Sequence, residues 1–363
     1  MTVGSLNGST ASQSLLSYPV GTTPERGQAI EVAPGVRWLR LPLPYRLDHI
    51  NVWALDDEGG WALVDTGTRT EETMAAWERL LGTAPLQRPL TRVFITHVHP
   101  DHIGMAGWLT RRFDVRMWIS RLEYLSCRAL LSDTCREAPA EAVRFYREAG
   151  WDDAALEHYR VRFGNFGKHV HALPDSFKRL TDGQAIRIGP HDWEVVVGSG
   201  HSPEHACLYC PALRLLISGD QVLPRISSNV SVHPGEPDAD PMTDWLASLD
   251  TLQSRIPDDV LVLPAHNDCF RGLHARIQQL REGQLGALQR LRELLSQPRC
   301  VPDTFAALFH RPVDHANGLQ LQLATGEAVA CLNHLLYRGE ITKELRQGGV
   351  AWYQRVPAGK PCG

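Results

Sequence analysis

The first third of the chain alternates short apolar runs with turns, a pattern that predicts β-strands. Residues 36–41 alternate apolar and polar side chains, and the apolar runs 51–55 and 61–64 are separated by an acidic turn that ends in two glycines. Strand, glycine turn and strand in succession are typical of a β-hairpin. Residues 70–82 carry apolar side chains at helical spacing, and the run 93–95 predicts a further buried strand.

Residues 120–165 differ from their surroundings, because their apolar residues fall into successive helical stretches. Pro139 fits the start of the second stretch, where its missing N–H costs little. We expect these helices to form an insertion that covers the functional site. Around the insertion, helices are predicted at 105–112, 244–256 and 273–295, and strands at 185–188, 193–197, 215–220 and 260–264.

The last part of the chain is predicted to be a separate small unit. A linker at 297–299 precedes helices at 302–308 and 319–336 and a final hairpin with a Gly-Gly turn. Helices followed by such a hairpin indicate a winged-helix-like domain. The predicted organisation is a flexible tail over residues 1–25, rich in Ser, Thr and Gly, then an α/β domain over 26–295 and the C-terminal unit over 296–363.

Composition narrows the class of protein without deciding its function. The 363 residues carry a formal net charge of −4, so the average charge indicates no polyanion-binding surface. The start of the chain lacks the pattern of a signal peptide, and we expect a cytoplasmic protein that does not bind a membrane. The eight cysteines are scattered, and the single CxxC pair, Cys207 and Cys210, is interpreted as two buried strand residues.

Side chains that suit a metal ion cluster directly after the strand at 93–95. His97, His99, Asp101 and His102 fall within six residues of one another. Imidazole nitrogens and carboxylate oxygens are good ligands for zinc and, less selectively, for iron or manganese. Burying so many ionisable groups without a metal would be costly. The sequence therefore predicts a metal site at the end of this strand.

This HxHxDH motif resembles that of the metallo-β-lactamase superfamily, and four further motifs of the family stand in the family's order at predicted strand ends. They are Asp-Thr-Gly at 65–67, Gly-His-Ser-Pro-Glu-His at 200–205, Gly-Asp at 219–220 and Pro-Ala-His at 264–266. The resemblance spans residues 29 to about 295 and implies an αββα sandwich that carries the helical insertion. One departure is that the last motif continues as Pro-Ala-His-Asn, where Pro-Gly-His-Gly is frequent in the family.

The resemblance also implies the roles of the site residues. Two zinc ions are expected, with iron or manganese as alternatives. His97, His99 and His201 would hold the first ion, Asp101, His102 and His266 the second, and Asp220 would bridge both opposite a hydroxide. Asp65 would accept a hydrogen bond from a ligand imidazole, and His205 would either support the ligands likewise or be a core histidine. Asp101 and Asp220 are the expected catalytic carboxylates, and Asp101 could accept and return a proton.

We expect the substrate to be a carboxylic thioester or ester of a small acyl molecule, as in glyoxalase II-like enzymes. The helical insertion offers apolar side chains that could line a pocket for an acyl chain: Leu122, Tyr124, Leu125, Leu130 and Phe145. Arg225 and His233 follow Asp220 closely and are candidate contacts to a substrate carboxylate or phosphate. A lactonase and a metal-dependent phosphodiesterase or endoribonuclease are the alternatives within this chemistry.

Nucleic acid is not the expected partner, because the C-terminal unit mixes basic residues with glutamates. A non-enzymatic nucleic-acid-binding regulator is the remote alternative, and it would require a vestigial metal site. The C-terminal unit could instead serve in packing or in forming a homodimer.

Overall fold

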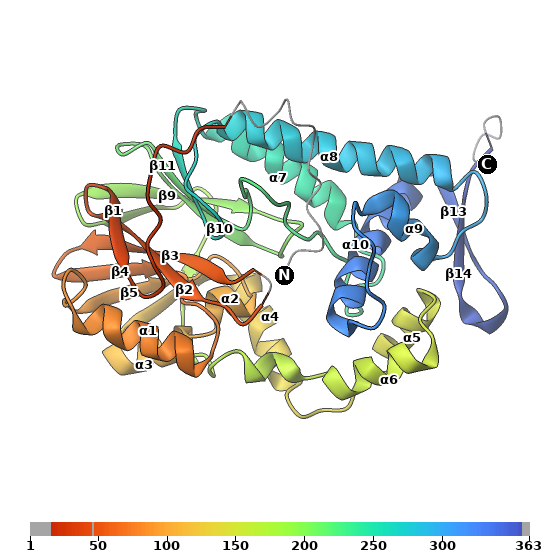
Figure 1. Ribbon diagram of the computed structural model, residues 1–363, viewed down its shortest axis with the longest axis horizontal. Helices are drawn as coiled ribbons and strands as arrows, with labels where there is room; N and C mark the ends of the chain where they lie inside the picture. Colours follow the sequence, from red (N-terminus) through yellow and green to blue (C-terminus); the bar gives the residue numbers. More distant parts are fainter. Residues whose placement is uncertain (1–15, 46, 358–363) are drawn as a thin grey trace.

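Two β-sheets packed face to face between helices form the main body of the protein (Figure 1). The computed structural model describes residues 16–45 and 47–357. The first sheet has the strand order β1-β2-β3-β4-β5-β6-β7, and the second has the order β12-β11-β10-β9-β8. Strands β1 to β4 and β8 to β11 pair antiparallel. The pairs from β4 to β7, and β11 with β12, are parallel.

The predicted strands and helices are present, and the first sheet contains two further strands, β6 and β7. The strands are β1 (Ala29–Ala33), β2 (Val36–Pro42), β3 (His49–Asp57), β4 (Gly60–Val64), β5 (Leu90–Phe94), β6 (Arg116–Ser120), β7 (Lys178–Leu180), β8 (Ala185–Ile188), β9 (His191–Gly198), β10 (His205–Cys210), β11 (Leu215–Gly219), β12 (Leu261–Pro264), β13 (Ile341–Leu345) and β14 (Ala351–Arg355). Strands β6 and β7, which precede and follow the insertion, were not predicted.

Helices are present in the predicted insertion and in the predicted C-terminal unit. They are α1 (Glu71–Gly82), α2 (Pro100–Ile103), α3 (Ala106–Phe113), α4 (Arg121–Ser132), α5 (Ala140–Glu148), α6 (Asp153–Arg162), α7 (Pro241–Arg255), α8 (Leu273–Leu294), α9 (Val301–Leu308) and α10 (Gly318–Tyr337). Among the described residues, none of the helices is both long and apolar enough to cross a membrane.

The layered arrangement follows from how the strands bury their side chains. In β4, Ala62 and Val64 belong to the core between the two sheets, whereas Leu63 belongs to the core beneath the helices on the outer face of the first sheet. Alternate side chains of a strand point to opposite faces, so a strand covered on both faces is apolar throughout. Trp77 on α1 and Trp245 on α7 are fully buried on the outer faces of the first and second sheets. The predicted αββα sandwich is confirmed.

The insertion and the C-terminal unit pack against each other beside the sandwich (Figure 1). Helix α8 runs from the sandwich into the C-terminal unit, which consists of α9, α10 and the β13–β14 hairpin. Trp151, between α5 and α6, donates an indole hydrogen bond of 2.9 Å to the Thr325 hydroxyl on α10. Two helices followed by a hairpin agree with the predicted order of elements, and the winged-helix assignment stays a prediction.

Part of the segment predicted to be a flexible tail lies along the sandwich. Residues 1–15 of that segment lie outside the described residues. Ser17 exchanges two backbone hydrogen bonds with Arg271, and Leu16 and Val20 pack against hydrophobic cores. Residues 16–25 therefore belong with the folded domain in this structure.

The CxxC pair is part of a strand, as interpreted from the sequence. Cys207 and Cys210 both lie on β10 and are buried. Cys207 belongs to the core under the helices and Cys210 to the core between the sheets. Residues three apart on a strand point to opposite faces, so the two thiols cannot share a metal ion or form a disulfide.

Candidate metal centre

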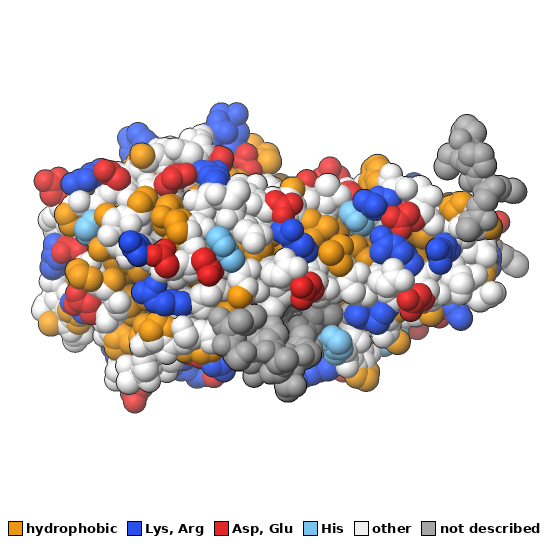
Figure 2. Space-filling view, turned by 90° about the horizontal axis from the view of Figure 1, so that it is seen from above, with side chains coloured by type: hydrophobic (Ala, Val, Ile, Leu, Met, Phe, Trp, Pro, Cys, Tyr) orange, Lys and Arg blue, Asp and Glu red, His pale blue; other side chains and the backbone are white. Residues whose placement is uncertain are grey.

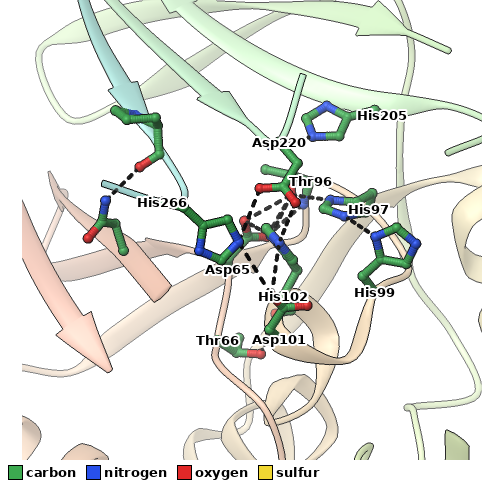
Figure 3. A network of polar contacts seen from close by, with 12 residues as sticks. Asp65, Thr66, Thr96, His97, His99, Asp101, His102, His205, Asp220 and His266 are labelled. Atoms are coloured by element: carbon green, nitrogen blue, oxygen red, sulfur yellow. Dashed lines mark hydrogen bonds and ion pairs between the residues drawn. The ribbon is translucent and has the colours of Figure 1, made fainter. Parts of the chain in front are cut away.

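The predicted metal ligands meet at one end of the two sheets, and Figure 3 labels all of them except His201. His97 and His99 lie in the loop after β5, and Asp101 and His102 lie in the short helix α2 that follows. The second sheet contributes the other three ligands from the loops that follow β9, β11 and β12, namely His201, Asp220 and His266. The strand ends of both sheets thus supply the site, as the positions of the motifs predicted.

Three imidazoles and one carboxylate form a first group. The Nε2 atom of His97 lies 2.8 Å from Nδ1 of His99 and 3.3 Å from Nε2 of His201. The Nε2 atom of His201 lies 3.5 Å from Oδ2 of Asp220. One ligand atom from each of these four residues lies within 4.8 Å of the others.

A second group lies beside the first and shares Asp220 with it. The Nε2 atom of His266 lies 3.4 Å from Oδ2 of Asp101 and 3.4 Å from Oδ1 of Asp220. The Nε2 atom of His102 lies 3.8 Å from Oδ2 of Asp101 and 3.6 Å from Oδ2 of Asp220. The Asp220 carboxylate therefore reaches both groups, which is the geometry a bridging ligand requires.

The two groups have the chemistry of a site for two divalent cations. The Nε2 atom of His102 and the Oδ1 atom of Asp220 are buried without a hydrogen-bond partner among the described residues. Such atoms are costly unless a ligand satisfies them. The donors are nitrogen and oxygen only, a set that suits zinc, manganese or iron. The residues present therefore fit the predicted pair of metal ions.

The ring nitrogens that point away from the groups are also held. The Nδ1 atoms of His201 and His266 lie 2.7 Å and 3.0 Å from the backbone carbonyl oxygens of Asn229 and His49. An Nδ1–H that donates to a carbonyl leaves Nε2 unprotonated and free to bind a metal. These contacts fix the tautomer and the orientation of both imidazoles.

Asp65 orients the His102 ligand of the second group. It has a left-handed backbone (φ 64°), an uncommon conformation for a residue other than glycine. Its carboxylate accepts the backbone N–H of Thr96 at 2.8 Å and lies 2.8 Å from Nδ1 of His102. The structure thus places Asp65 where the sequence predicted it, beside a ligand imidazole.

Replacing Asp65 by asparagine is expected to weaken metal binding at the second group about 10- to 100-fold. The amide cannot accept all the hydrogen bonds that the carboxylate accepts from Thr96 and His102. The measurement is the metal dissociation constant from chelator competition. Asp57→Asn is a matched control, since Asp57 is a buried acid that accepts from Arg92 at the other end of the first sheet. Equal losses of metal affinity in both variants would contradict the role given to Asp65.

His205 supports the bridging carboxylate. Its Nε2 atom accepts the backbone N–H of Asp220 at 3.1 Å, and its ring stacks on His97 at 4.8 Å. Burial and the neighbouring His201 lower the pKa of His205 to about 3, so the ring is neutral and can accept this bond. A side chain on Gly219 (φ 50°) would lie 2.6 Å from the His205 ring. Of the two roles foreseen for His205, the geometry supports the first.

The buried charges of the site stabilise one another. Burial by itself would raise the pKa of Asp220, but His266 and His102 hold it well below its usual range. Burial would lower the pKa of His102, but Asp65, Asp220 and Asp101 together raise it. Burial and the other imidazoles lower the pKa of His97. Asp220 therefore stays ionised and His97 stays neutral, the states in which both bind metal.

Comparison with known proteins agrees with this geometry. A family model described as the metallo-beta-lactamase superfamily matches residues 45–266. The chain belongs to the metallo-β-lactamase superfamily. A second model, described as the metallo-beta-lactamase-like C-terminal domain, matches residues 288–356 and begins within α8. With its His and Asp groups in place, the protein is a metal-dependent hydrolase of this superfamily.

Solved structures and a curated relative cover much of the chain. A beta-lactamase domain protein from Burkholderia ambifaria is 40% identical with a TM-score of 0.84, covering 96% of this chain and 100% of that chain. A metallo-beta-lactamase family protein from Thermus thermophilus is 26% identical with a TM-score of 0.75, covering 90% of this chain and 100% of that chain. An uncharacterized protein from Aquifex aeolicus is 23% identical over 216 residues, which are 59% of this chain and 82% of that protein.

The departure from the superfamily's frequent Pro-Gly-His-Gly sequence has a local explanation. Asn267 occupies the position of the second glycine and has a left-handed backbone (φ 67°). Asparagine tolerates this conformation better than most residues. Ala265, in place of the first glycine, is buried, and its N–H donates to the Gly219 carbonyl at 3.0 Å. The motif therefore presents His266 without the two glycines.

The three predicted substrate contacts have different surroundings. Tyr124 is buried, stacks on Phe177 at 4.1 Å and donates its hydroxyl to the Pro174 carbonyl. It is therefore a core residue, and its prediction as a substrate contact is corrected. Arg225 pairs with Asp268 at 2.7 Å, so its charge is already matched. His233 is exposed, and its contact with a substrate stays a prediction.

One buried acid that the sequence analysis missed ties two ligand loops together. Glu123 on α4 accepts the backbone N–H groups of Val98 and Glu204, each at 2.8 Å. Val98 lies between the ligands His97 and His99, and Glu204 follows His201 by three residues. The helical insertion therefore helps to hold the first group. The sequence does contain one signal for this role, because Glu123 is a charged residue among the apolar positions of the predicted helix.

Proposed function

We propose that this hydrolase cleaves a carboxylic thioester or ester and that its two metal ions are zinc, with manganese or iron as substitutes. The observation that carries the proposal is an apolar strip on α4 beside the metal centre. Leu122 and Leu125 are 45% and 52% exposed. The backbone N–H of Leu122 donates to the Glu204 carboxylate at 2.8 Å, which sets the start of α4 against the loop that carries His201. Exposed leucines beside a group of polar metal ligands suit the binding of an acyl chain whose carbonyl group reaches those ligands.

The side chains of the site have complementary parts in such a reaction. Two divalent ions, when bound, would lower the pKa of a water molecule and polarise a carbonyl oxygen. Asp220 and the imidazoles would hold the two ions in place beside the carbonyl of a bound substrate. Although burial opposes it, His102 and His266 lower the pKa of Asp101, which keeps this carboxylate ionised. Asp101 is the group proposed to accept and return a proton.

Charge pairing argues against a polyanionic substrate. Arg338, Lys343 and Arg346 of the C-terminal unit each pair with a glutamate, at 2.6, 3.6 and 3.3 Å. On the face in Figure 2, basic and acidic side chains are interspersed over the length of the molecule. Binding to RNA requires several cationic contacts to phosphate. An uncharged acyl arm requires none, which favours the thioester or ester.

Turnover of acyl thioesters that is insensitive to salt is the expected result. The panel contains acyl thioesters of an uncharged thiol with increasing acyl chain length, lactones, bis-p-nitrophenyl phosphate and single-stranded RNA, each over a salt series, with Asp101→Ala as the inactive control. A substrate held by its apolar arm should lose little affinity as salt rises, whereas RNA binding should weaken steeply. RNA cleavage that disappears in the control, without thioester turnover, would overturn the proposal. Turnover of lactones alone would refute the thioester assignment.

Two leucines on α4 allow the acyl chain to be located. Leu125→Ser is expected to lower kcat/KM for long acyl chains about tenfold, the equivalent of losing one buried leucine contact, and to leave the acetyl thioester unchanged. Leu130→Ser is the matched control, because Leu130 is also exposed on α4 but lies about one and a half turns further along. Equal effects of the two substitutions would remove the α4 strip from the proposal.

A further inference from the structure

A buried acid of the C-terminal unit lies two contacts away from a metal ligand. Glu327 is the only Asp, Glu, Lys or Arg in α10, and it is buried. Its Oε2 atom accepts a hydrogen bond of 2.8 Å from the side-chain amide of Asn229. The backbone carbonyl of the same Asn229 accepts from Nδ1 of His201 at 2.7 Å. The contacts thus run from α10 through one asparagine to the first metal group.

Tight backbone packing fixes this connection. The backbone N–H of Val232 donates to the Gly326 carbonyl at 3.0 Å. A side chain on Gly326 would lie 2.8 Å from the Ser231 hydroxyl and 2.9 Å from the Val232 carbonyl oxygen. The segment 229–232 therefore rests directly on α10, because position 326 has no side chain. Ser231 also donates to the side-chain oxygen of Asn229, so both ends of that amide are held.

The second metal group has its supports elsewhere. The Nδ1 atom of His102 contacts Asp65, and that of His266 contacts the carbonyl of His49. Asp65 and His49 belong to the first sheet and its loops, within the superfamily domain matched at residues 45–266. The two groups therefore differ in their dependence on the C-terminal unit.

We propose that Glu327 is a positioning residue for the first metal group, so that the C-terminal unit sets the metal affinity of His97, His99 and His201 and leaves that of Asp101, His102 and His266 unchanged. Burial raises the pKa of Glu327 to about 8, although the hydrogen bond from Asn229 opposes the rise, so the acid is neutral at pH 7. Glutamine has the shape of the neutral acid and can accept the same bond. Methionine fills a similar volume but offers no such acceptor. The inference concerns metal binding and does not rest on the proposed substrate.

The experiment measures metal dissociation constants by chelator competition in two backgrounds. His266→Ala disables the second group and reports on the first, and His97→Ala does the reverse. In the first background, Glu327→Met is expected to raise the zinc dissociation constant about 10- to 100-fold, the range observed when a residue that orients a ligand histidine is lost. Glu327→Gln is expected to keep the constant of the background protein. In the second background, neither substitution should change the constant.

A control on the same helix separates positioning from general destabilisation. Thr325→Val removes the hydrogen bond from Trp151 two residues away, so it should lower the unfolding midpoint without changing either metal affinity. Asn229→Leu removes the Glu327 contact from the other side and should mimic Glu327→Met, with no further loss in the double variant. If Glu327→Met does not fold, Asn229→Leu alone tests the proposal. Equal weakening in both backgrounds, or a normal first-group affinity in Glu327→Met or Asn229→Leu, would overturn the proposal.

Discussion

Replacing Asp220 by alanine is expected to remove metal from both groups and to lower kcat/KM by at least about a thousandfold. One carboxylate lies 3.5 Å from His201 of the first group and 3.4 Å from His266 of the second, so its loss affects both. The thousandfold figure corresponds to the several kcal/mol of charge stabilisation that a metal ion supplies. Metal content by elemental analysis and turnover of the best substrate in the panel are the measurements.

The control for this substitution is another aspartate near the same loops. Asp268 follows the ligand His266 by two residues but pairs with Arg225 and contacts neither group. Asp268→Ala should keep two metal ions per chain. Full metal content and normal turnover in Asp220→Ala would refute its bridging role.

Removal of metal by a chelator is expected to abolish turnover and to lower the melting temperature, with zinc or manganese restoring both. Ions that bind only the folded state stabilise it by RT ln(1 + [L]/Kd), about 4 kcal/mol at a thousand times the dissociation constant. The ligands come from loops of both sheets, so an ion bound there also ties the two sheets together. Differential scanning calorimetry with and without chelator measures the shift.

The same chelator applied to Asp220→Ala supplies the comparison. That variant should already lack metal, so its melting temperature should not move. A wild-type protein whose stability is unaffected by complete metal removal would show that the two groups do not bind structural ions.

The ligands could be predicted from sequence because metal binding imposes local patterns. His97, His99, Asp101 and His102 lie in one loop and helix, and each remaining ligand lies within three residues of the end of a strand. The end of an apolar run in the sequence marks the end of a buried strand. A histidine or aspartate just after such a run can therefore be recognised as a candidate ligand. The apolar runs predicted the individual strands, whereas the sandwich was predicted from the resemblance to the superfamily.

The supporting residues could not be predicted, because their roles depend on which segments pack together. Glu327 contacts Asn229 across 98 positions of the chain. Arg225 is a plausible anion contact until Asp268, 43 residues away, is seen to pair with it. Tyr124 and Leu125 are neighbours on one helix, and only the packing of α4 decides that the tyrosine is buried and the leucine exposed. Helical spacing predicts the helix but not which face meets the core.

The spread of the ligands along the chain determines when the site can form during synthesis. The first sheet and the HxHxDH loop are made first, but the first group lacks His201, the bridge Asp220 comes later, and the second group ends at His266. At about 5–20 residues per second, the ribosome needs roughly ten to thirty seconds to pass from His97 to His266. All seven ligands are therefore present together only after His266 has been synthesised, so the second group cannot reach its full ligand set before that point.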